Sequence, residues 1–166
     1  MGDEGSGYQI GREAIAAALR ARDGMGPRTV LERRLCEEKY LSSLDQIVRW
    51  VYGKEGGREG IAALCPMVFE AARDGDAVAQ EIIEHAGRAL GSLVGAVARR
   101  LRMQDRVRLG LIGGVFKEKD KLLPSLLHTA ETEIGQVEVC APRFSPAVGA
   151  ALLAFKHIGA TVTITT

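Results

Sequence analysis

The sequence predicts a mostly α-helical fold that ends in a small α/β unit with an incomplete parallel sheet. Apolar residues recur at helical spacing through residues 7–102, whereas only two short strand-like segments follow, each joined to a helical pattern. The composition agrees, because 20 glycines and only 5% aromatic residues suit helices with tight turns better than a sandwich or barrel. We therefore divide the chain into a helical portion, 1–104, and a βαβα portion, 105–166.

Capping signals define the first helix. Ser6 and Gln9 form an S-x-x-Q capping box, and apolar residues at helical spacing follow it. Gly24, after Asp23, suits the left-handed position beyond the helix end. The opening stretch GDEGSGYQIG is therefore a turn that leads into a helix, and a second, short helix is expected over 27–39.

The middle of the helical portion carries a second capping box and a break. Ser43 and Gln46 repeat the S-x-x-Q pattern before a run of apolar residues. The segment 54–60, KEGGREG, is charged and glycine-rich, which favours a linker. A helix is expected to start at Cys65-Pro66, because proline is tolerated in the first turn of a helix.

The longest helix is expected from Ala77 to about Arg102. The segment 74–76, Asp-Gly-Asp, closes the preceding helix and caps this one. Glycines fall every fourth residue along one face of it, at Gly87, Gly91 and Gly95. This spacing indicates close packing of another helix rather than a chemical site.

The βαβα portion alternates strand and helix. Residues 107–114 read as a strand that ends in paired glycines, and 136–142 read as a second strand. Helical patterns follow each strand, over 121–135 and over 145–159, which predicts a parallel pair. Two strands are too few for a covered parallel sheet, so the sheet is expected to be incomplete. The last residues, 161–166, are either a third strand or a poorly ordered end.

Composition excludes several classes of function. With 22 basic and 21 acidic residues the chain shows no electrostatic signature for nucleic acid or a membrane surface, and no apolar run reaches a membrane span. The cysteines are widely spaced with no CxxC pair, which indicates buried thiols in a reducing compartment. We expect a cytoplasmic protein without a metal cluster. The isolated cysteines and histidines are Cys36, Cys65, Cys140, His85, His128 and His157.

Two glycine-rich segments could bind a ligand. Gly113-Gly114 follows a strand at the carboxyl edge of a parallel sheet, where a nucleotide could approach the backbone, although Gly-Gly also makes ordinary turns. The opening turn places Asp3 and Glu4 beside free amides of a helix N-terminus. Asp3 could accept hydrogen bonds from a sugar, or both carboxylates could only complement the helix dipole.

Several motifs occur together and in a characteristic order. Together they resemble the ATPase family named after BadF, BadG, BcrA and BcrD, to which N-acetylglucosamine kinase belongs. The resemblance covers almost the whole chain. The matching segments are GDEGSGYQIGREAI, VRWVYG, AARDGDAVA, LIGGVFK and SPAVGAALLA.

The resemblance implies an actin-like, ribonuclease-H-like ATPase fold that uses ATP and magnesium to phosphorylate an amino sugar. By the same resemblance, Asp3 corresponds to a residue that contacts the sugar. Ala62 matches a position that lines the nucleotide site. Gly114 and Glu118, with Gly113 beside them, match the adenosine-binding loop.

The resemblance also shows departures. The DGGGT-type phosphate loop, the second phosphate loop and the catalytic aspartate of the family are not found in these residues. We therefore expect the C-terminal half of a kinase-type protein, inactive alone, whose complete form uses ATP, magnesium and an amino sugar. Two alternatives remain: an ATPase that activates a dehydratase or reductase, and a non-enzymatic helical module that forms homodimers.

Overall fold

The computed structural model describes residues 2–103 and 106–160, and within them the chain is mostly helical with one two-stranded parallel sheet. The boundary expected at 104–105 and the possible third strand at 161–166 lie outside the described residues. The α-helices are α1 (Gly7–Arg22), α2 (Leu31–Glu38), α3 (Ile47–Tyr52), α4 (Arg58–Ala62), α5 (Cys65–Arg73), α6 (Ala77–Arg100), α7 (Lys119–Ile134) and α8 (Pro146–His157). The 3₁₀ helices are η1 (Leu44–Gln46) and η2 (Gly114–Glu118), and the strands are β1 (Val107–Gly110) and β2 (Val137–Cys140).

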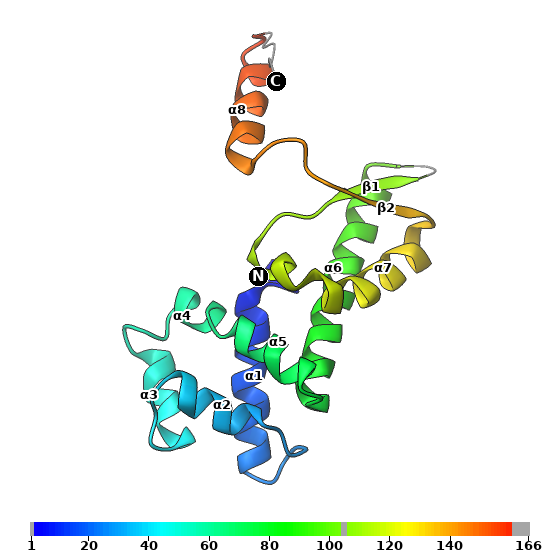
Figure 1. The fold of residues 1–166 in the computed structure, drawn as a ribbon. Helices are drawn as coiled ribbons and strands as arrows, with labels where there is room; N and C mark the ends of the chain where they lie inside the picture. Colours follow the sequence, from blue (N-terminus) through cyan, green and yellow to red (C-terminus); the bar gives the residue numbers. More distant parts are fainter. Residues whose placement is uncertain (1, 104–105, 161–166) are drawn as a thin grey trace.

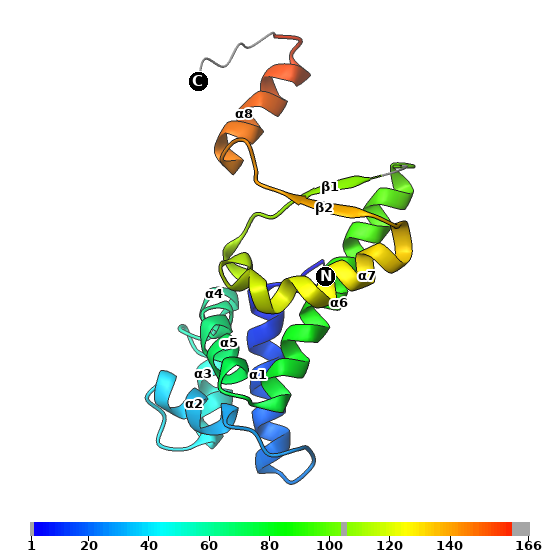
Figure 2. The same cartoon turned by 45° about the vertical axis from the view of Figure 1, so that its right-hand side comes forward.

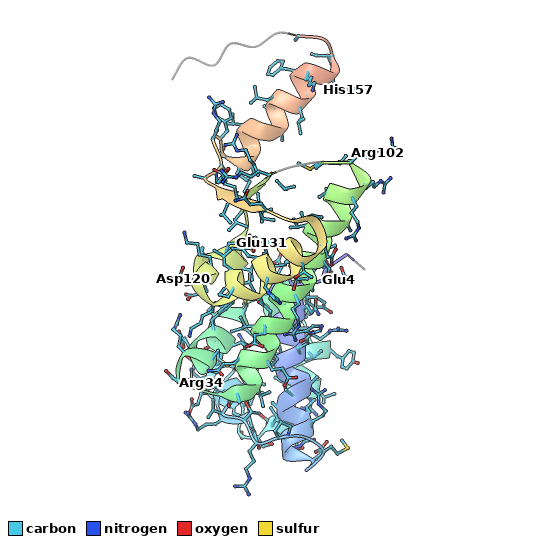
Figure 3. All side chains as sticks on the ribbon, turned by 90° about the vertical axis from the view of Figure 1, so that its right-hand side faces the viewer. Glu4, Arg34, Arg102, Asp120, Glu131 and His157 are labelled. Carbon is cyan, nitrogen blue, oxygen red and sulfur yellow. The ribbon has the colours of Figure 1, made fainter. Side chains whose placement is uncertain are left out.

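The molecule is elongated, with the helical body at one end and α8 at the other (Figures 1 and 2). Helices α1, α5 and α6 form the body, α7 packs along the later part of α6, and the two strands lie beyond α7. In Figure 3, His157 lies near the upper end of the molecule and Arg34 in the lower part of the helical body. No residue of α8 is buried.

The hydrophobic core lies in the helical body, where α1, α2, α5 and α6 meet. Its largest fully buried side chains there include Ile10, Leu35 and Phe69. Burial of each such side chain stabilises the fold by about 1.5–3 kcal/mol. Burial in the helical body therefore contributes most of the packing stabilisation, and this body supports η2 and the opening turn.

The Ser6 half of the predicted capping box of α1 is confirmed, whereas Gln9 reaches back to the amide of Gly5, one residue before the cap. Ser6 Oγ accepts a hydrogen bond from the Gln9 amide (3.2 Å), and Gln9 Oε1 accepts one from the Gly5 amide (2.8 Å). Gly24 has a positive φ of 71°, as expected just beyond the helix end. The second box is only half formed, because Ser43 makes no side-chain cap, although Gln46 Oε1 accepts from the Ser42 amide (3.1 Å).

Asp76 joins two helices. Its carboxylate accepts from the Ala79 amide (2.8 Å) and thereby caps α6, which confirms the predicted start of that helix. The same carboxylate accepts from the Val30 amide (2.8 Å) and the Thr29 hydroxyl (2.9 Å). These bonds hold residues 29–30 outside a helix, so the expectation of a helix from residue 27 was wrong and α2 begins at Leu31.

Close backbone packing explains two of the glycine-rich segments. A methyl group added at Gly91 of α6 would lie 2.5 Å from the Leu126 carbonyl oxygen of α7, which confirms the predicted helix contact. The segment 54–60 is not a free linker, because α4 begins at Arg58. A methyl group at Gly60 would collide with the Glu55 carbonyl oxygen, so this segment is folded tightly on itself.

Strands β1 and β2 pair in parallel, with Val107 opposite Val137 and Gly110 opposite Cys140. The strand expected over 107–114 ends at Gly110. The segment that follows β2 reaches Pro142, which has no amide hydrogen to continue the hydrogen-bond ladder. The paired glycines at 113–114 therefore lie in the turn that enters η2 rather than at the strand end.

Candidate functional site

A pocket of about 530 Å³ lies where the first turn of α1, the turn between α4 and α5, and η2 meet. Three residues expected at a nucleotide site line it: Ala62, Gly114 and Glu118. Gly113 does not line it but directly precedes η2, with a positive φ of 130°. The complete lining is Gly7, Ala62, Ala63, Cys65, Pro66, Phe69, Gly114, Val115, Lys117 and Glu118.

The local sequence explains how these three segments converge. Pro66 lies in the first turn of α5, where its missing amide hydrogen costs nothing, so α5 restarts sharply after α4. Gly7 has no side chain, and a methyl group there would lie 3.4 Å from Cys65 Cβ and 3.5 Å from the Ala62 carbonyl oxygen. These are ordinary van der Waals distances, so α1 lies directly against the α4–α5 turn at this position.

The pocket is apolar with charge at its edge. Most of its lining is aliphatic, aromatic or glycine, whereas Lys117 and Glu118 are charged. Glu118 forms an ion pair with Arg73 of α5. Burial raises the pKa of the Cys65 thiol to about 12, and the Glu118 charge adds to this effect, so Cys65 stays protonated at neutral pH and is no nucleophile.

Asp3 lies outside this pocket, in a smaller hollow on the other side of the first turn of α1. That hollow is lined by Asp3, Glu4, Tyr8, Gln9 and Arg12. The Arg58 guanidinium donates to both carboxylate oxygens of Asp3, with Nη1 2.6 Å from Oδ2, and it also lies 5.2 Å from the centre of the Tyr8 ring. The hydrogen bonds from Arg58 lower the pKa of Asp3.

The Asp3 carboxylate keeps capacity for a second partner. An ionised carboxylate has about four acceptor positions, and the two hydrogen bonds from Arg58 leave the others available to hydroxyl donors. Arg58 begins α4 and Ala62 ends it, so this one short helix contacts Asp3 at its start and the larger pocket at its end. Sequence reasoning missed Arg58, since its segment looked like a linker.

Comparison with known proteins decides the family. The sequence profile of the BadF/BadG/BcrA/BcrD ATPase family matches residues 1–154. The chain belongs to this family. The Dictyostelium discoideum protein named N-acetyl-D-glucosamine kinase is 32% identical over 159 residues, which cover 94% of the chain and 50% of that protein.

A bacterial relative agrees with the first. The Clostridium acetobutylicum protein named N-acetylmuramic acid/N-acetylglucosamine kinase is 33% identical over 155 residues, covering 93% of the chain and 51% of that protein. The chain thus spans about half the length of the curated relatives it matches. Both of these relatives carry the names of amino-sugar kinases.

The pocket of this BadF/BadG/BcrA/BcrD family member has the size and lining of a small-molecule site. Its volume lies within the range of about 300–1,000 Å³ of small-molecule sites, and its walls suit a flat apolar ring with one polar edge. Within residues 2–103 and 106–160, no three carboxylate, imidazole or thiol groups gather to hold a metal ion. These residues alone therefore do not fit magnesium, which binds mostly through phosphate and water oxygens in such sites.

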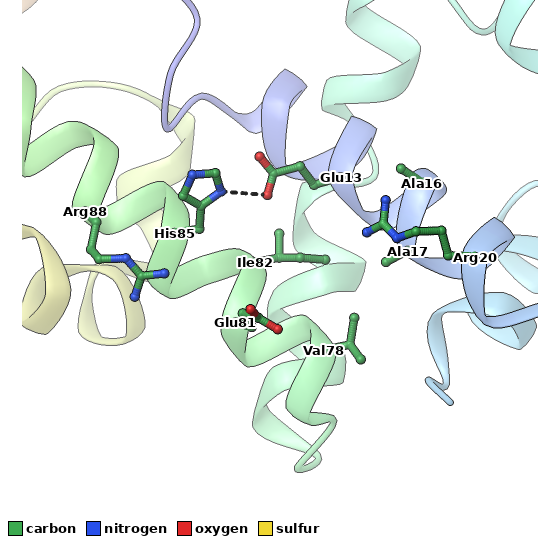
Figure 4. A pocket seen from close by; sticks show the side chains of 9 residues that line it. All are labelled: Glu13, Ala16, Ala17, Arg20, Val78, Glu81, Ile82, His85 and Arg88. Carbon is green, nitrogen blue, oxygen red and sulfur yellow. Dashed lines mark hydrogen bonds and ion pairs between the residues drawn. The ribbon is translucent and has the colours of Figure 1, made fainter. Parts of the chain in front are cut away.

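Two further findings concern expectations from composition. Among residues 2–103 and 106–160 no helix is both long and apolar enough to cross a membrane. His85 is not isolated: its Nδ1 lies 3.1 Å from Glu13 Oε2, across a groove between α1 and α6 (Figure 4). No local sequence pattern indicates this pair, since its members are 72 residues apart.

Proposed function

We propose that this chain is the C-terminal, nucleotide- and sugar-binding portion of an ATP-dependent amino-sugar kinase with an actin-like, ribonuclease-H-like fold. The observation that carries the proposal is the convergence of Ala62, Gly114 and Glu118 on one apolar pocket. These residues come from segments that are far apart in the sequence. The names of the two relatives support an N-acetylglucosamine or glucosamine type of acceptor.

In this proposal the pocket takes the adenosine part of ATP. The apolar walls contact the adenine ring, and Gly114 lets the backbone approach the ligand because it has no side chain. Gly113 sets the direction of the loop through its positive φ. Glu118 accepts a hydrogen bond from a ribose hydroxyl, as acidic residues do in other nucleotide sites.

The Asp3 turn takes the sugar. Asp3 accepts hydrogen bonds from sugar hydroxyls, while Arg58 keeps the carboxylate ionised and fixes its orientation. The half-buried carboxylate favours ligands that donate hydrogen bonds to its remaining acceptor positions, as sugar hydroxyls do. In the complete protein, the phosphates of ATP and water would hold magnesium, which would offset the phosphate charge.

Binding of ADP tests the proposal. We expect binding with a dissociation constant on the order of 1 mM, since only part of the site is formed by these residues. In saturation-transfer NMR, Ala62→Trp should abolish the ADP signal by filling the pocket, whereas Ala16→Trp, which lines the separate α1–α6 groove, should retain it. Glu118→Gln should weaken binding about tenfold through loss of a charge-assisted hydrogen bond. Equal ADP binding by all three variants would overturn the pocket assignment.

A phosphorylation assay tests the second part. We propose that this chain alone does not phosphorylate a sugar, because phosphoryl transfer needs phosphate-loop amides and a general base that its motifs do not supply. ATP-dependent phosphorylation of glucosamine or N-acetylglucosamine by the purified 166-residue chain would contradict this proposal.

The exposed C-terminal helix favours a second candidate function, a helical module that forms homodimers. Large apolar side chains of α8 and of the residue that follows it are exposed: Leu153 is 71% exposed and Ile158, the residue after the helix, is 72% exposed. Exposed apolar surface of this kind commonly marks an interaction site. Light scattering should show a dimer that Leu153→Glu dissociates, and a stable monomer at high concentration would count against it.

A further inference from the structure

A chain of three hydrogen bonds connects α6 to the turn that carries Asp3. The Gly5 amide donates to Gln9 Oε1 (2.8 Å), and Gln9 Nε2 donates to Glu13 Oε1 (2.6 Å). The other Glu13 oxygen, Oε2, lies 3.1 Å from Nδ1 of His85, the last link, which Figure 4 draws. The chain thus runs from the third turn of α6, along the first two turns of α1, to the opening turn.

The partners fix the direction of every bond. The Gly5 amide can only donate and the ionised Glu13 carboxylate can only accept, so the Gln9 side-chain amide must present its oxygen to Gly5 and its nitrogen to Glu13. For the same reason His85 must carry a proton on Nδ1 to bond to Glu13. A change at His85 therefore reaches Gly5 through one defined set of donors and acceptors.

The Gly5 end of this chain is part of the Asp3 turn. Gly5 has a positive φ of 73°, and the Ser6 amide donates to the Asp3 carbonyl oxygen (3.0 Å). A methyl group at Gly5 would lie 2.7 Å from the Ala86 carbonyl oxygen and would also collide with Leu90, so the turn rests directly on α6. The same helix therefore supports the turn by packing at Ala86 and by hydrogen bonding at His85.

We infer that His85 is a positioning residue for the Asp3 turn and that its protonation state is transmitted to that turn through Glu13 and Gln9. A protonated His85 draws the Glu13 carboxylate toward α6, which changes the Gln9 amide and the Gly5 hydrogen bond. The inference concerns sugar binding only insofar as the proposed role of Asp3 holds. The hydrogen-bond chain itself does not depend on that role.

Other charges face His85 in the same groove. Arg20 and Glu13 come from α1, whereas Glu81 and Arg88 come from α6 itself. Arg88 Nη1 lies 3.5 Å from Oε2 of Glu84, which is one turn earlier on α6. Within the described residues Glu13 is the group that contacts the ring directly, and its side chain is 23% exposed, so it is the one positioned to respond to His85.

NMR titration of the 166-residue chain between about pH 5 and 8, the usual range of histidine, tests the inference without any sugar. We expect the backbone amide signal of Gly5 to shift with the same midpoint as the ring signals of His85. The His85→Asn variant should lose that component of the shift. The matched His128→Asn variant, at an exposed site on α7, should keep it. A Gly5 signal that follows the same curve in wild type and in His85→Asn would overturn the inference.

Hydrogen exchange separates charge from packing. Glu13→Ala removes the middle of the chain, and we expect Gly5 amide exchange to accelerate about twofold to tenfold, the effect of losing one hydrogen bond. Glu13→Gln keeps an acceptor for Gln9 but no charge, so it should preserve the slow exchange and abolish the pH response. Unchanged Gly5 exchange in Glu13→Ala would contradict the chain. Because these readouts need no sugar or nucleotide, their failure is distinct from failure of the proposed function.

Discussion

The contact between α6 and α7 allows a quantitative prediction, because glycine occupies a helical position there although alanine has the higher helix propensity. Gly91 is buried in the middle of α6, and alanine at an ordinary helical site stabilises a helix by about 1 kcal/mol relative to glycine. A methyl group at Gly91 would lie 2.5 Å from the Leu126 carbonyl oxygen and 2.7 Å from Thr129 Cβ. The backbone oxygen cannot rotate away, so α7 must move.

We therefore expect Gly91→Ala to destabilise the protein. Overpacking costs about 1–3 kcal/mol, and a collision with a backbone oxygen belongs in the upper part of this range, at about 2–3 kcal/mol. Subtracting the gain in helix propensity of about 1 kcal/mol leaves a net loss in unfolding free energy of about 1–2 kcal/mol, which lowers Tm by about 2–8 °C for a chain of this size. Urea denaturation followed by circular dichroism at 222 nm measures this loss.

The exposed Ala96 of the same helix supplies the control. Ala96→Gly should cost about 1 kcal/mol through helix propensity alone, and this value calibrates the intrinsic effect in α6. A Gly91→Ala variant as stable as the wild type, or more stable, would refute the close α6–α7 contact.

Three further changes test other parts of the structure. Asp76→Ala should destabilise the protein by about 2 kcal/mol in urea denaturation, because it removes the α6 cap and the bonds to residues 29–30, whereas Ser145→Ala at the exposed cap of α8 should change little. Arg58→Ala should raise the pKa of Asp3 in an NMR titration. Because folding lowers that pKa, the stability contributed by this carboxylate is present above its unfolded pKa and is lost as the pH falls through its folded pKa. This pH dependence of the stability should vanish in the variant. Cys65 should react with iodoacetamide at pH 8 far more slowly than the two half-buried cysteines, and equal rates in the folded protein would contradict its burial.

Local signals made the helical part of the fold predictable. The caps at Ser6 and Asp76 depend on residues within three positions of them, so the sequence indicates them directly. The glycine row of α6 likewise indicated a partner helix. The second role of Asp76, bonding to residues 29–30, is not local, which is why the start of α2 was placed four residues too early.

The candidate sites were predictable only in part. The family resemblance indicated Asp3 and the pocket residues, and the structure brings Ala62, Gly114 and Glu118 together. The resemblance gave no indication of Arg58, because a charged, glycine-rich segment has the same composition whether it is a free linker or a tight turn. The Glu13–His85 pair was equally hidden, since contacts between distant segments depend on how helices pack.

The location of bound ADP decides whether the pocket lined by Ala62, Gly114 and Glu118 binds a nucleotide. Backbone amide signals of the ¹⁵N-labelled chain should be followed as ADP is added to about 10 mM, ten times a dissociation constant on the order of 1 mM. We predict that the largest shifts occur at Ala63, Gly114 and Val115, which line the pocket, and that Ala62→Trp abolishes them. Shifts confined to the groove around His85, or no shifts at all, would contradict it.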